Sequence, residues 1–181
     1  MASSFHNLIF AFLFLLPHVF AAKNSGESEN ARLTHLHFYL HDTLSGPRPS
    51  AVRVAGLSPK NATATTSLGF GDIVVIDDPL TEGPSISSAL VGRAQGFYVH
   101  ASTEGIALEM VVNLVLLRGE YNGSTLVVVG RNAVLEMTRE FAVVGGSGSF
   151  RLARGWVVDK TYAVDPKTGD GIFEFDVYVQ H

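Results

Sequence analysis

Short apolar segments follow one another along this chain, and glycine, proline, asparagine and aspartate separate them. The segments with the composition of β-strands are 33–42, 52–56, 68–76, 91–101, 106–117, 125–129, 141–144, 150–158 and 172–179. Turn-forming residues lie between them, for example at 45–49, 121–123 and 165–169. No convincing amphipathic helix interrupts the series. The pattern therefore predicts an all-β fold, either an antiparallel sandwich or a closed barrel.

Alternation is clearest in residues 33–42, where the two faces of the predicted strand differ in chemistry. The first face is apolar and ends in an acid, with Leu36, Phe38, Leu40 and Asp42. The second face carries His35, His37, Tyr39 and His41. Successive side chains of a strand point to opposite faces, so we expect the carboxyl of Asp42 to point into the interior.

Acidic and basic residues near strand ends form the main candidate site. They are Asp42, the pair Asp77 and Asp78 at the end of another strand, and Arg139 and Arg154 on later strands. A carboxyl in an apolar lumen has a raised pKa and can act as a general acid. A neighbouring arginine can stabilise an oxyanion. The alternative is a structural ion pair at the rim of the barrel or a turn cap.

Histidines and glycines suggest two other kinds of site. His35 and His37, at i and i+2, could ligate a metal, but they lie on the predicted outer face and lack the further Glu and His ligands of a cupin oxidase. We therefore interpret them as solvent-exposed or interface histidines and predict no metal site. The glycines of residues 145–148 precede a strand rather than a phosphate-binding helix, and indicate a tight hairpin. The chain has no cysteine, which excludes disulfides and thiolate chemistry.

Residues 106–117 are apolar on both faces, which is unusual for a barrel wall in contact with water. Val111, Val115 and Leu117 lie on the predicted outer face, interrupted by Glu109 and Asn113. Because little helical sequence is available to cover this wall, we predict that another copy of the chain covers it.

The N-terminal region predicts secretion. Residues 1–22 read as a signal peptide with a short apolar run and a small-residue cleavage site, 23–32 as a flexible tail, and 33–181 as the folded domain. Two sequons, at Asn61 and Asn122, are candidate glycosylation sites. The net charge of −4 gives no indication of binding to nucleic acid or an anionic membrane.

Several segments together resemble the plant dirigent protein family. They are 38–43 (FYLHDT), 70–79 (FGDIVVIDDP), 93–98 (RAQGFY), 119–125 (GEYNGST) and 138–139 with 143–155, in family order. The resemblance implies an eight-stranded antiparallel β-barrel that is secreted to the plant cell wall and assembles as a trimer, with a dimer as the alternative. It also implies a role in phenylpropanoid and lignan chemistry. Each barrel would hold a phenoxy-radical pair or a quinone methide and direct the stereochemistry of coupling, without a cofactor, while a separate oxidase or laccase supplies the radicals.

The resemblance also implies roles for individual residues. Asp42 corresponds to the pocket acid and Arg139 to the cation beside the substrate oxygen, whereas Asp77, Tyr98 and Thr161 correspond to further pocket residues.

One position departs from the lignan-forming pattern. Asn132 stands where those proteins carry a second pocket aspartate, and an amide cannot exchange a proton as a carboxylate does. Residues 130–132 and 121–125 are closer to the subfamily of pterocarpan synthases and gossypol-directing proteins. The alternative function is therefore a cofactor-free hydro-lyase that dehydrates a 2′-hydroxyisoflavanol through a quinone methide. A third candidate function is that of a non-catalytic secreted barrel that binds phenolics.

Overall fold

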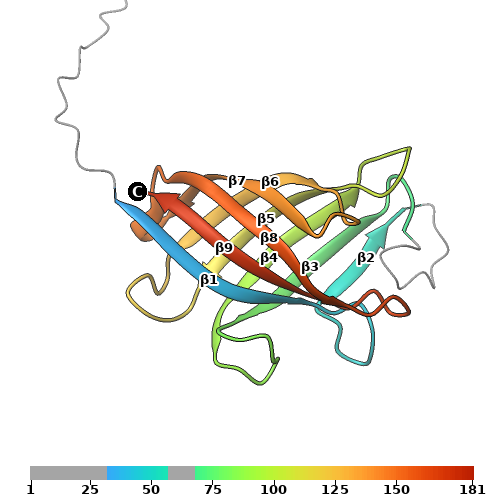
Figure 1. The fold of residues 1–181 in the computed structure, drawn as a ribbon, viewed down its shortest axis with the longest axis horizontal. Coiled ribbons are helices and arrows are strands. Elements are labelled where there is room, and N and C mark those ends of the chain that lie inside the picture. Colours follow the sequence, from blue (N-terminus) through green and yellow to red (C-terminus); the bar gives the residue numbers. More distant parts are fainter. Residues whose placement is uncertain (1–31, 57–67) are drawn as a thin grey trace, which may run out of the picture.

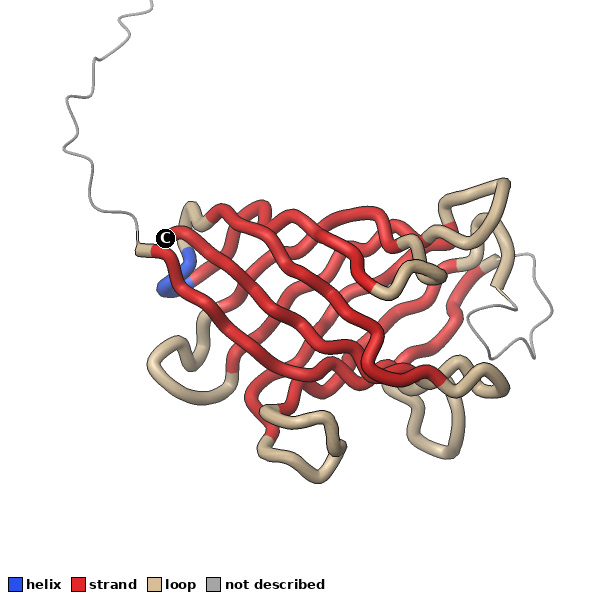
Figure 2. Tube along the Cα trace, viewed as in Figure 1, coloured by secondary structure: helices blue, strands red, loops and turns tan. Residues whose placement is uncertain are grey.

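Nine antiparallel strands wrap around one apolar interior in the computed structural model, which describes residues 32–56 and 68–181 (Figures 1 and 2). The strands are β1 (Leu33–Asp42), β2 (Ala51–Ala55), β3 (Ile73–Thr81), β4 (Leu90–His100), β5 (Leu108–Leu116), β6 (Thr125–Asn132), β7 (Thr138–Ser147), β8 (Arg154–Val164) and β9 (Gly171–Gln180). One turn of 3-10 helix, η2 (Gly148–Phe150), lies between β7 and β8. Among the described residues, no helix is long and apolar enough to span a membrane.

The sheet closes into a barrel with eight strand positions. Its order is β1-β9-β8-β7-β6-β5-β4-β3-β2, and β1 also pairs with β3. The first half of β3 pairs with β2, while its last two residues pair with Tyr39 and Leu40 of β1. Thus β1 and β2 share one position in the ring. The closed barrel, rather than the sandwich, is the confirmed alternative, and closure removes the sheet edges that would otherwise invite pairing with other chains.

Alternation along the strands fills the barrel as expected from residues 33–42. Phe38 and Leu40 are buried. They pack in a core with inward residues from all the other strands, including Val74, Val112 and Val177. Apolar side chains fill one end of the barrel. The other end, at the right in Figure 1, retains a cavity.

The predicted tight hairpin at residues 145–148 is wrong, because Gly145 and Gly146 lie in β7 and the β7–β8 pairing ends at Val143 and Gly155. Of these glycines only Gly148 lies in the connection, in η2, and the strand after it begins later than expected. Gly148 has φ +63°, and a Cβ at this position would lie 2.6 Å from Ser124 Oγ. Leu152 also has φ +63° and is 85% exposed, so the predicted strand 150–158 is wrong before Arg154. The turn brings Phe150, the last residue of η2, into the core, where it is fully buried.

A continuous apolar row crosses the outer face of β2–β6, as the two-faced pattern of 106–117 predicted. Strand register places in one row Val52, Val75, Phe97, Val111 and Val129. We call this row the outer apolar band. Val52 is 50% exposed, Val75 45% and Phe97 39%.

Candidate functional site

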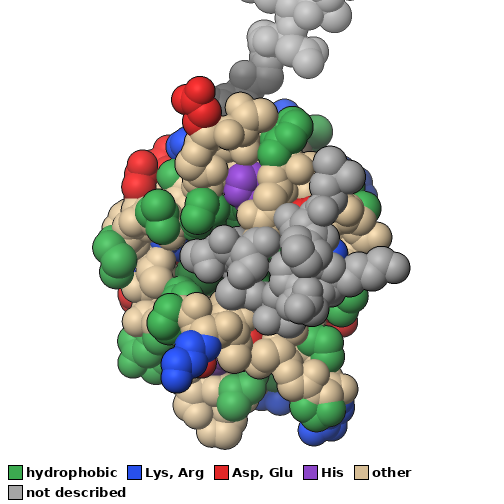
Figure 3. All heavy atoms as spheres, turned by 90° about the vertical axis from the view of Figure 1, so that its right-hand side faces the viewer, with side chains coloured by type: hydrophobic (Ala, Val, Ile, Leu, Met, Phe, Trp, Pro, Cys, Tyr) green, Lys and Arg blue, Asp and Glu red, His purple; other side chains and the backbone are tan. Residues whose placement is uncertain are grey.

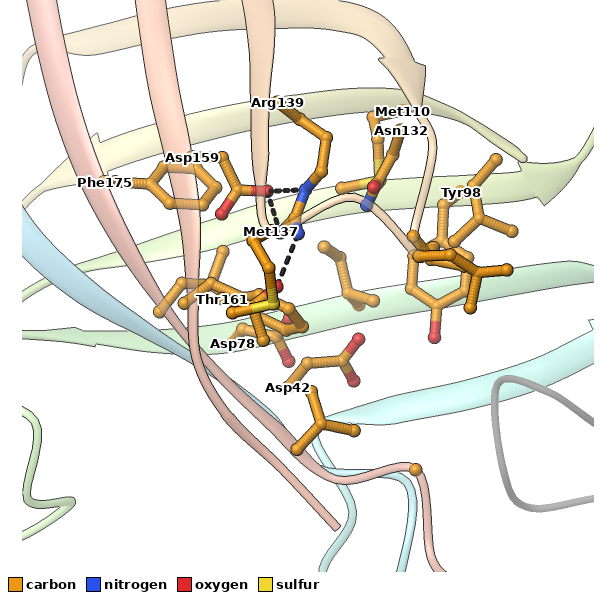
Figure 4. A pocket seen from close by; sticks show the side chains of 18 residues that line it. Asp42, Asp78, Tyr98, Met110, Asn132, Met137, Arg139, Asp159, Thr161 and Phe175 are labelled. Atoms are coloured by element: carbon orange, nitrogen blue, oxygen red, sulfur yellow. Dashed lines mark hydrogen bonds and ion pairs between the residues drawn. The ribbon is translucent and has the colours of Figure 1, made fainter. Parts of the chain in front are cut away.

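A cavity of about 270 Å³ lies inside the barrel at the end where β1 and β6 terminate. The turn between β6 and β7 contributes Leu135 and Met137 to its rim, both more than two-thirds exposed. Figure 3 faces this end and shows hydrophobic side chains among the polar ones there. The lining is mostly apolar, and a few polar groups converge in it (Figure 4). That combination is typical of small-molecule sites.

Asp42, Asp78 and Tyr98 form the acidic side of the cavity. Asp42 is the last residue of β1 and continues the inward face of Phe38 and Leu40. Asp78 follows the inward Val74 and Ile76 of β3 and is fully buried. Figure 4 shows both carboxyls below the Arg139 guanidinium.

Burial keeps this acidic side at least partly protonated near neutral pH. It raises the pKa of Asp42 to about 7, while the nearby Tyr98 hydroxyl opposes the rise. It raises the pKa of Asp78 further, to about 9, and the neighbouring Asp42 charge adds to that rise. Two like charges in one apolar site cannot both form readily, so the two carboxyls titrate as a pair. Burial also raises the pKa of Tyr98 well above its usual value, which keeps its hydroxyl as a neutral donor.

Several polar atoms of this side have no hydrogen-bond partner among the described residues. They are Asp42 Oδ1, both carboxyl oxygens of Asp78 and the hydroxyl of Tyr98. Buried polar groups are nearly always paired, and an unpaired one carries a free-energy cost. These atoms are therefore free to bond a polar group of a ligand.

Arg139 forms the basic side, and the β7–β8 register explains its position. Arg139 lies directly opposite Asp159, and its Nε and Nη2 donate to Asp159 Oδ2 at 3.1 and 2.6 Å. Its Nη1 donates to Thr161 Oγ1 at 2.5 Å and to the Glu136 carbonyl at 2.6 Å. Arginine has five N–H donors, so these four bonds leave one for a ligand.

The surroundings of Arg139 fix both its charge and its orientation. The guanidinium carbon lies 5.5 Å from the centre of the Phe173 ring, within the range of a cation–π contact. Burial raises the pKa of Asp159 to about 6, and the Arg139 charge limits that rise. At neutral pH the pair is therefore ionised, and the cation is held rigidly at the cavity.

Asn132 is a further polar residue of the cavity, in addition to the acidic side and the basic side. It is 8% exposed, and its Oδ1 has no hydrogen-bond partner among the described residues. Its Nδ2 contacts only the weak acceptor Met110 Sδ, at 3.8 Å. A buried amide in this state can both donate to and accept from a ligand hydroxyl.

The expectation for Asp77 needs correction. Its side chain lies on the outer face, where Arg93 Nε donates to Oδ1 at 2.5 Å and Gln95 Nε2 at 3.0 Å. The Arg93 hydrogen bond lowers the pKa of Asp77. The carboxyl that enters the cavity is that of Asp78, because side chains alternate along β3. Arg154 also lies outside and donates to the Val144 carbonyl at 2.6 Å.

Of the residues expected at the site, the structure brings five together around the cavity: Asp42, Tyr98, Asn132, Arg139 and Thr161. Sequence reasoning missed Asp159. Asp159 lies two residues after the inward-pointing Val157, so strand alternation alone could have placed its side chain in the lumen. Its partner Arg139 could be identified only from the β7–β8 register. Asn122 lies exposed between β5 and β6, whereas Asn61 lies outside the described residues, as do 1–31. Glycosylation and the signal peptide remain predictions.

Comparisons with known proteins agree on one family. A family model described as "Dirigent-like protein" matches residues 33–180. Pterocarpan synthase 1 of Glycyrrhiza echinata is 49% identical over 154 residues, which cover 84% of this chain and 80% of the relative. Dirigent protein 1 of Arabidopsis thaliana is 47% identical over 150 residues, 83% of this chain and 80% of the relative. A solved pterocarpan synthase dirigent protein superposes with a TM-score of 0.78 at 48% identity, covering 83% of this chain and 96% of that one.

Proposed function

The chain belongs to the Dirigent-like protein family, and we propose that it is a cofactor-free lyase of phenolic substrates. In this proposal the barrel removes water from a phenol that carries a benzylic hydroxyl, as in a 2′-hydroxyisoflavanol. It then holds the resulting quinone methide while an internal phenol closes the ring on one face. The observation that carries the proposal is the pair of buried carboxyls, Asp42 and Asp78, that lines an apolar cavity, where burial raises the pKa of both.

Loss of water requires an acid at the leaving oxygen. A carboxyl with a pKa near the working pH is an efficient proton donor, and Asp42 meets this condition. Its proton passes to the benzylic hydroxyl, the C–O bond breaks, and water leaves. The phenol para or ortho to that carbon gives up its proton as the quinone methide forms. When the second phenol oxygen attacks the electrophilic carbon, its proton passes to the Asp42 carboxylate, and the quinone-methide oxygen takes up the proton that the first phenol released. Each turnover therefore yields one water and restores both the acid and the first phenol.

Arg139 stabilises the negative charge that appears on oxygen during these steps. Its guanidinium lines the cavity with one N–H uncommitted, while Asp159 and Thr161 fix its orientation. A preorganised donor of this kind stabilises a phenolate without reorganisation. The apolar wall excludes water, which would otherwise add to the quinone methide.

The size of the cavity favours one fused-ring ligand. Its volume of about 270 Å³ lies just below the usual range for small-molecule pockets, roughly 300–1,000 Å³. We infer that one isoflavanol, rather than a pair of separate phenylpropanoids, suits a cavity of this size.

Stereochemical direction of phenoxy-radical coupling, as in lignan biosynthesis, is the second candidate. It is favoured by the similar identity to a protein named dirigent protein 1. In that case a separate oxidase or laccase supplies the radicals, and the same carboxyls and Arg139 bind the phenolic oxygens.

We also propose that the protein is secreted and works as a homo-oligomer, most simply a trimer. The outer apolar band supports the second point, since contiguous exposed apolar surface is typical of protein interfaces.

Chiral chromatography of two reactions separates the candidates. The protein is incubated alone with a racemic 2′-hydroxyisoflavanol, and separately with coniferyl alcohol plus laccase. Stereoselective ring closure without oxidant supports the lyase. Enantiomeric excess only in the laccase reaction supports stereochemical direction of radical coupling. If neither reaction is affected, the remaining candidate is a non-catalytic barrel that binds phenolics.

A further inference from the structure

One carboxylate ties the loop that follows Asp42 to the turn between β8 and β9. Asp170 is the last residue before β9, and the pairing of β1 with β9 ends at Asp42 and Gly171. Asp170 Oδ1 accepts the backbone N–H groups of Leu44 and Ser45 at 2.8 and 3.0 Å, and its Oδ2 accepts the Ser45 hydroxyl at 2.5 Å. We propose that Asp170 is a positioning residue for Asp42, because it fixes the chain just beyond the acid and places a negative charge beside it. This inference rests on the proposed function of Asp42 as the acid.

The chain is held on both sides of Asp42. Before it, β1 is paired with β9 along its whole length. Directly after it, Thr43 donates its N–H to Ser50 Oγ at 3.1 Å, and its carbonyl accepts the N–H groups of Ser50 and Ala51 at 2.9 and 3.0 Å. Asp170 then holds the next two residues. The acid is therefore oriented before a substrate enters, which matters because a displacement of roughly 1 Å can cost about 10²-fold in rate.

The charge of Asp170 also acts on Asp42. Burial raises the pKa of Asp170, but hydrogen bonds from the Ser45 hydroxyl, from the N–H groups of residues 44 and 45 and from Thr168 outweigh it and bring this pKa below its ordinary value. Asp170 is therefore ionised at neutral pH. Burial is the main cause of the raised pKa of Asp42, the Tyr98 hydroxyl opposes the rise, and the Asp170 charge adds to it. Both carboxyl residues line a second cavity, at the end of β1 and the β8–β9 turn.

The other ionisable groups around Asp42 are neutral, paired or turned away. They are Asp78 on β3, Tyr98 on β4, Arg139 on β7, Asp159 on β8 and His41 on the other face of β1. Burial favours the neutral forms of Asp78 and Tyr98. Arg139 is paired with Asp159, and His41 bonds Thr81 Oγ1 at 2.7 Å. Asp170 accepts from N–H and hydroxyl groups, and in the part of the chain that the structure describes no lysine or arginine forms an ion pair with it. Its negative charge is therefore not compensated by a cation.

Carbon-13 NMR titration of the aspartate carboxyls tests the proposal without a substrate. The protein is labelled at the aspartate Cγ, and Asp42→Asn identifies the Asp42 signal. Asp170→Asn removes the charge but keeps an oxygen that can accept the same N–H groups, and far-UV circular dichroism verifies that the barrel is retained. Because a like charge disfavours ionisation, the pKa of Asp42 should fall below its wild-type value in Asp170→Asn.

Two further variants show whether the effect belongs to Asp170. Asp165→Asn removes an equal charge from the same turn, where Asp165 is exposed and accepts the N–H of Lys167 at 2.8 Å. It is the matched control and should leave the pKa of Asp42 unchanged. Asp170→Glu keeps the charge and should return the pKa of Asp42 toward the wild-type value.

Turnover of a 2′-hydroxyisoflavanol gives a second readout. From a pKa of about 7, a fall of one unit lowers the protonated fraction of Asp42 at pH 7 by about fivefold. Asp170→Asn should therefore have a lower kcat than the wild type at pH 7 and approach it near pH 5, with little change in KM. The NMR shift depends on Asp170 alone, whereas turnover also depends on the lyase function, so the two proposals can fail separately. A folded Asp170→Asn protein in which Asp42 titrates as in the wild type overturns the inference, and so does an equal shift in Asp165→Asn.

Discussion

Replacing Asp78 by asparagine should stabilise the protein at neutral pH, although it alters the proposed site. Burial, and then the charge of Asp42, raises the pKa of this carboxyl from 3.8 to about 9. The unfolded chain ionises it at the ordinary pKa, so folding at pH 7 must protonate it. The interval from 3.8 to pH 7 is about three units at about 1.4 kcal/mol each, which gives a cost of about 4 kcal/mol as an upper bound.

The raised pKa determines the direction of the pH dependence. Below the pKa that Asp78 has in the unfolded chain, its burial does not lower the free energy of unfolding. The loss of free energy grows as the pH rises from about 4 toward about 9. The wild type should therefore lose stability across this interval more steeply than Asp78→Asn. Both Asp78 oxygens lack a hydrogen-bond partner at bonding distance among the described residues, and the nearby Ser50 hydroxyl can donate to a carboxyl or an amide oxygen alike. The substitution therefore removes the ionisation and keeps a neutral polar group.

Urea unfolding, followed by the fluorescence of Trp156, measures this difference at several pH values between about 4 and 8. Asp77→Asn is the matched control. That carboxyl is exposed and its pKa is lowered by Arg93, so its loss should lower stability slightly at neutral pH. The reasoning is refuted if Asp78→Asn is less stable than the wild type at neutral pH, or if both proteins show the same pH slope.

Three further changes test other parts of the structure. Asp159→Asn leaves the buried guanidinium of Arg139 without a counter-charge and should lower the free energy of unfolding by about 3–5 kcal/mol; an unchanged urea midpoint would contradict the buried pair. Phe97→Lys places a charge in the outer apolar band, and light scattering should show a smaller assembly with unchanged circular dichroism. Gly148→Ala should lower stability by about 1–3 kcal/mol, because φ is +63° and the new Cβ meets Ser124; urea unfolding at wild-type stability would show that the turn is not constrained.

Strand alternation predicted the inner wall well because it depends only on local sequence. Phe38 and Leu40 point inward, and Asp42 follows them into the cavity. Alternation also places the Asp78 side chain inside the barrel and the Asp77 side chain outside, but only when it is known which residues of β3 point inward. The resemblance supplied a motif with two adjacent acids, and the inward Val74 and Ile76 decide which one faces the lumen.

Contacts between distant segments could not be predicted in the same way. The Arg139–Asp159 pair depends on the β7–β8 register. The connection between these strands contains, two residues after η2, a left-handed Leu152, a conformation that the sequence does not indicate for a leucine. The contacts of His35 and His37 with Asp176 likewise exist only because β9 returns beside β1.

The most direct test of the proposed chemistry is the product formed by Asp42→Asn. Wild type, Asp42→Asn and Asp77→Asn are each incubated with a racemic 2′-hydroxyisoflavanol in the absence of oxidant, and the ring-closed product is separated by chiral chromatography. If Asp42 is the acid, the wild type and Asp77→Asn form one enantiomer at similar rates, and Asp42→Asn is slower by about 10²-fold or more. An Asp42→Asn protein with full rate and unchanged enantiomeric excess would contradict the account.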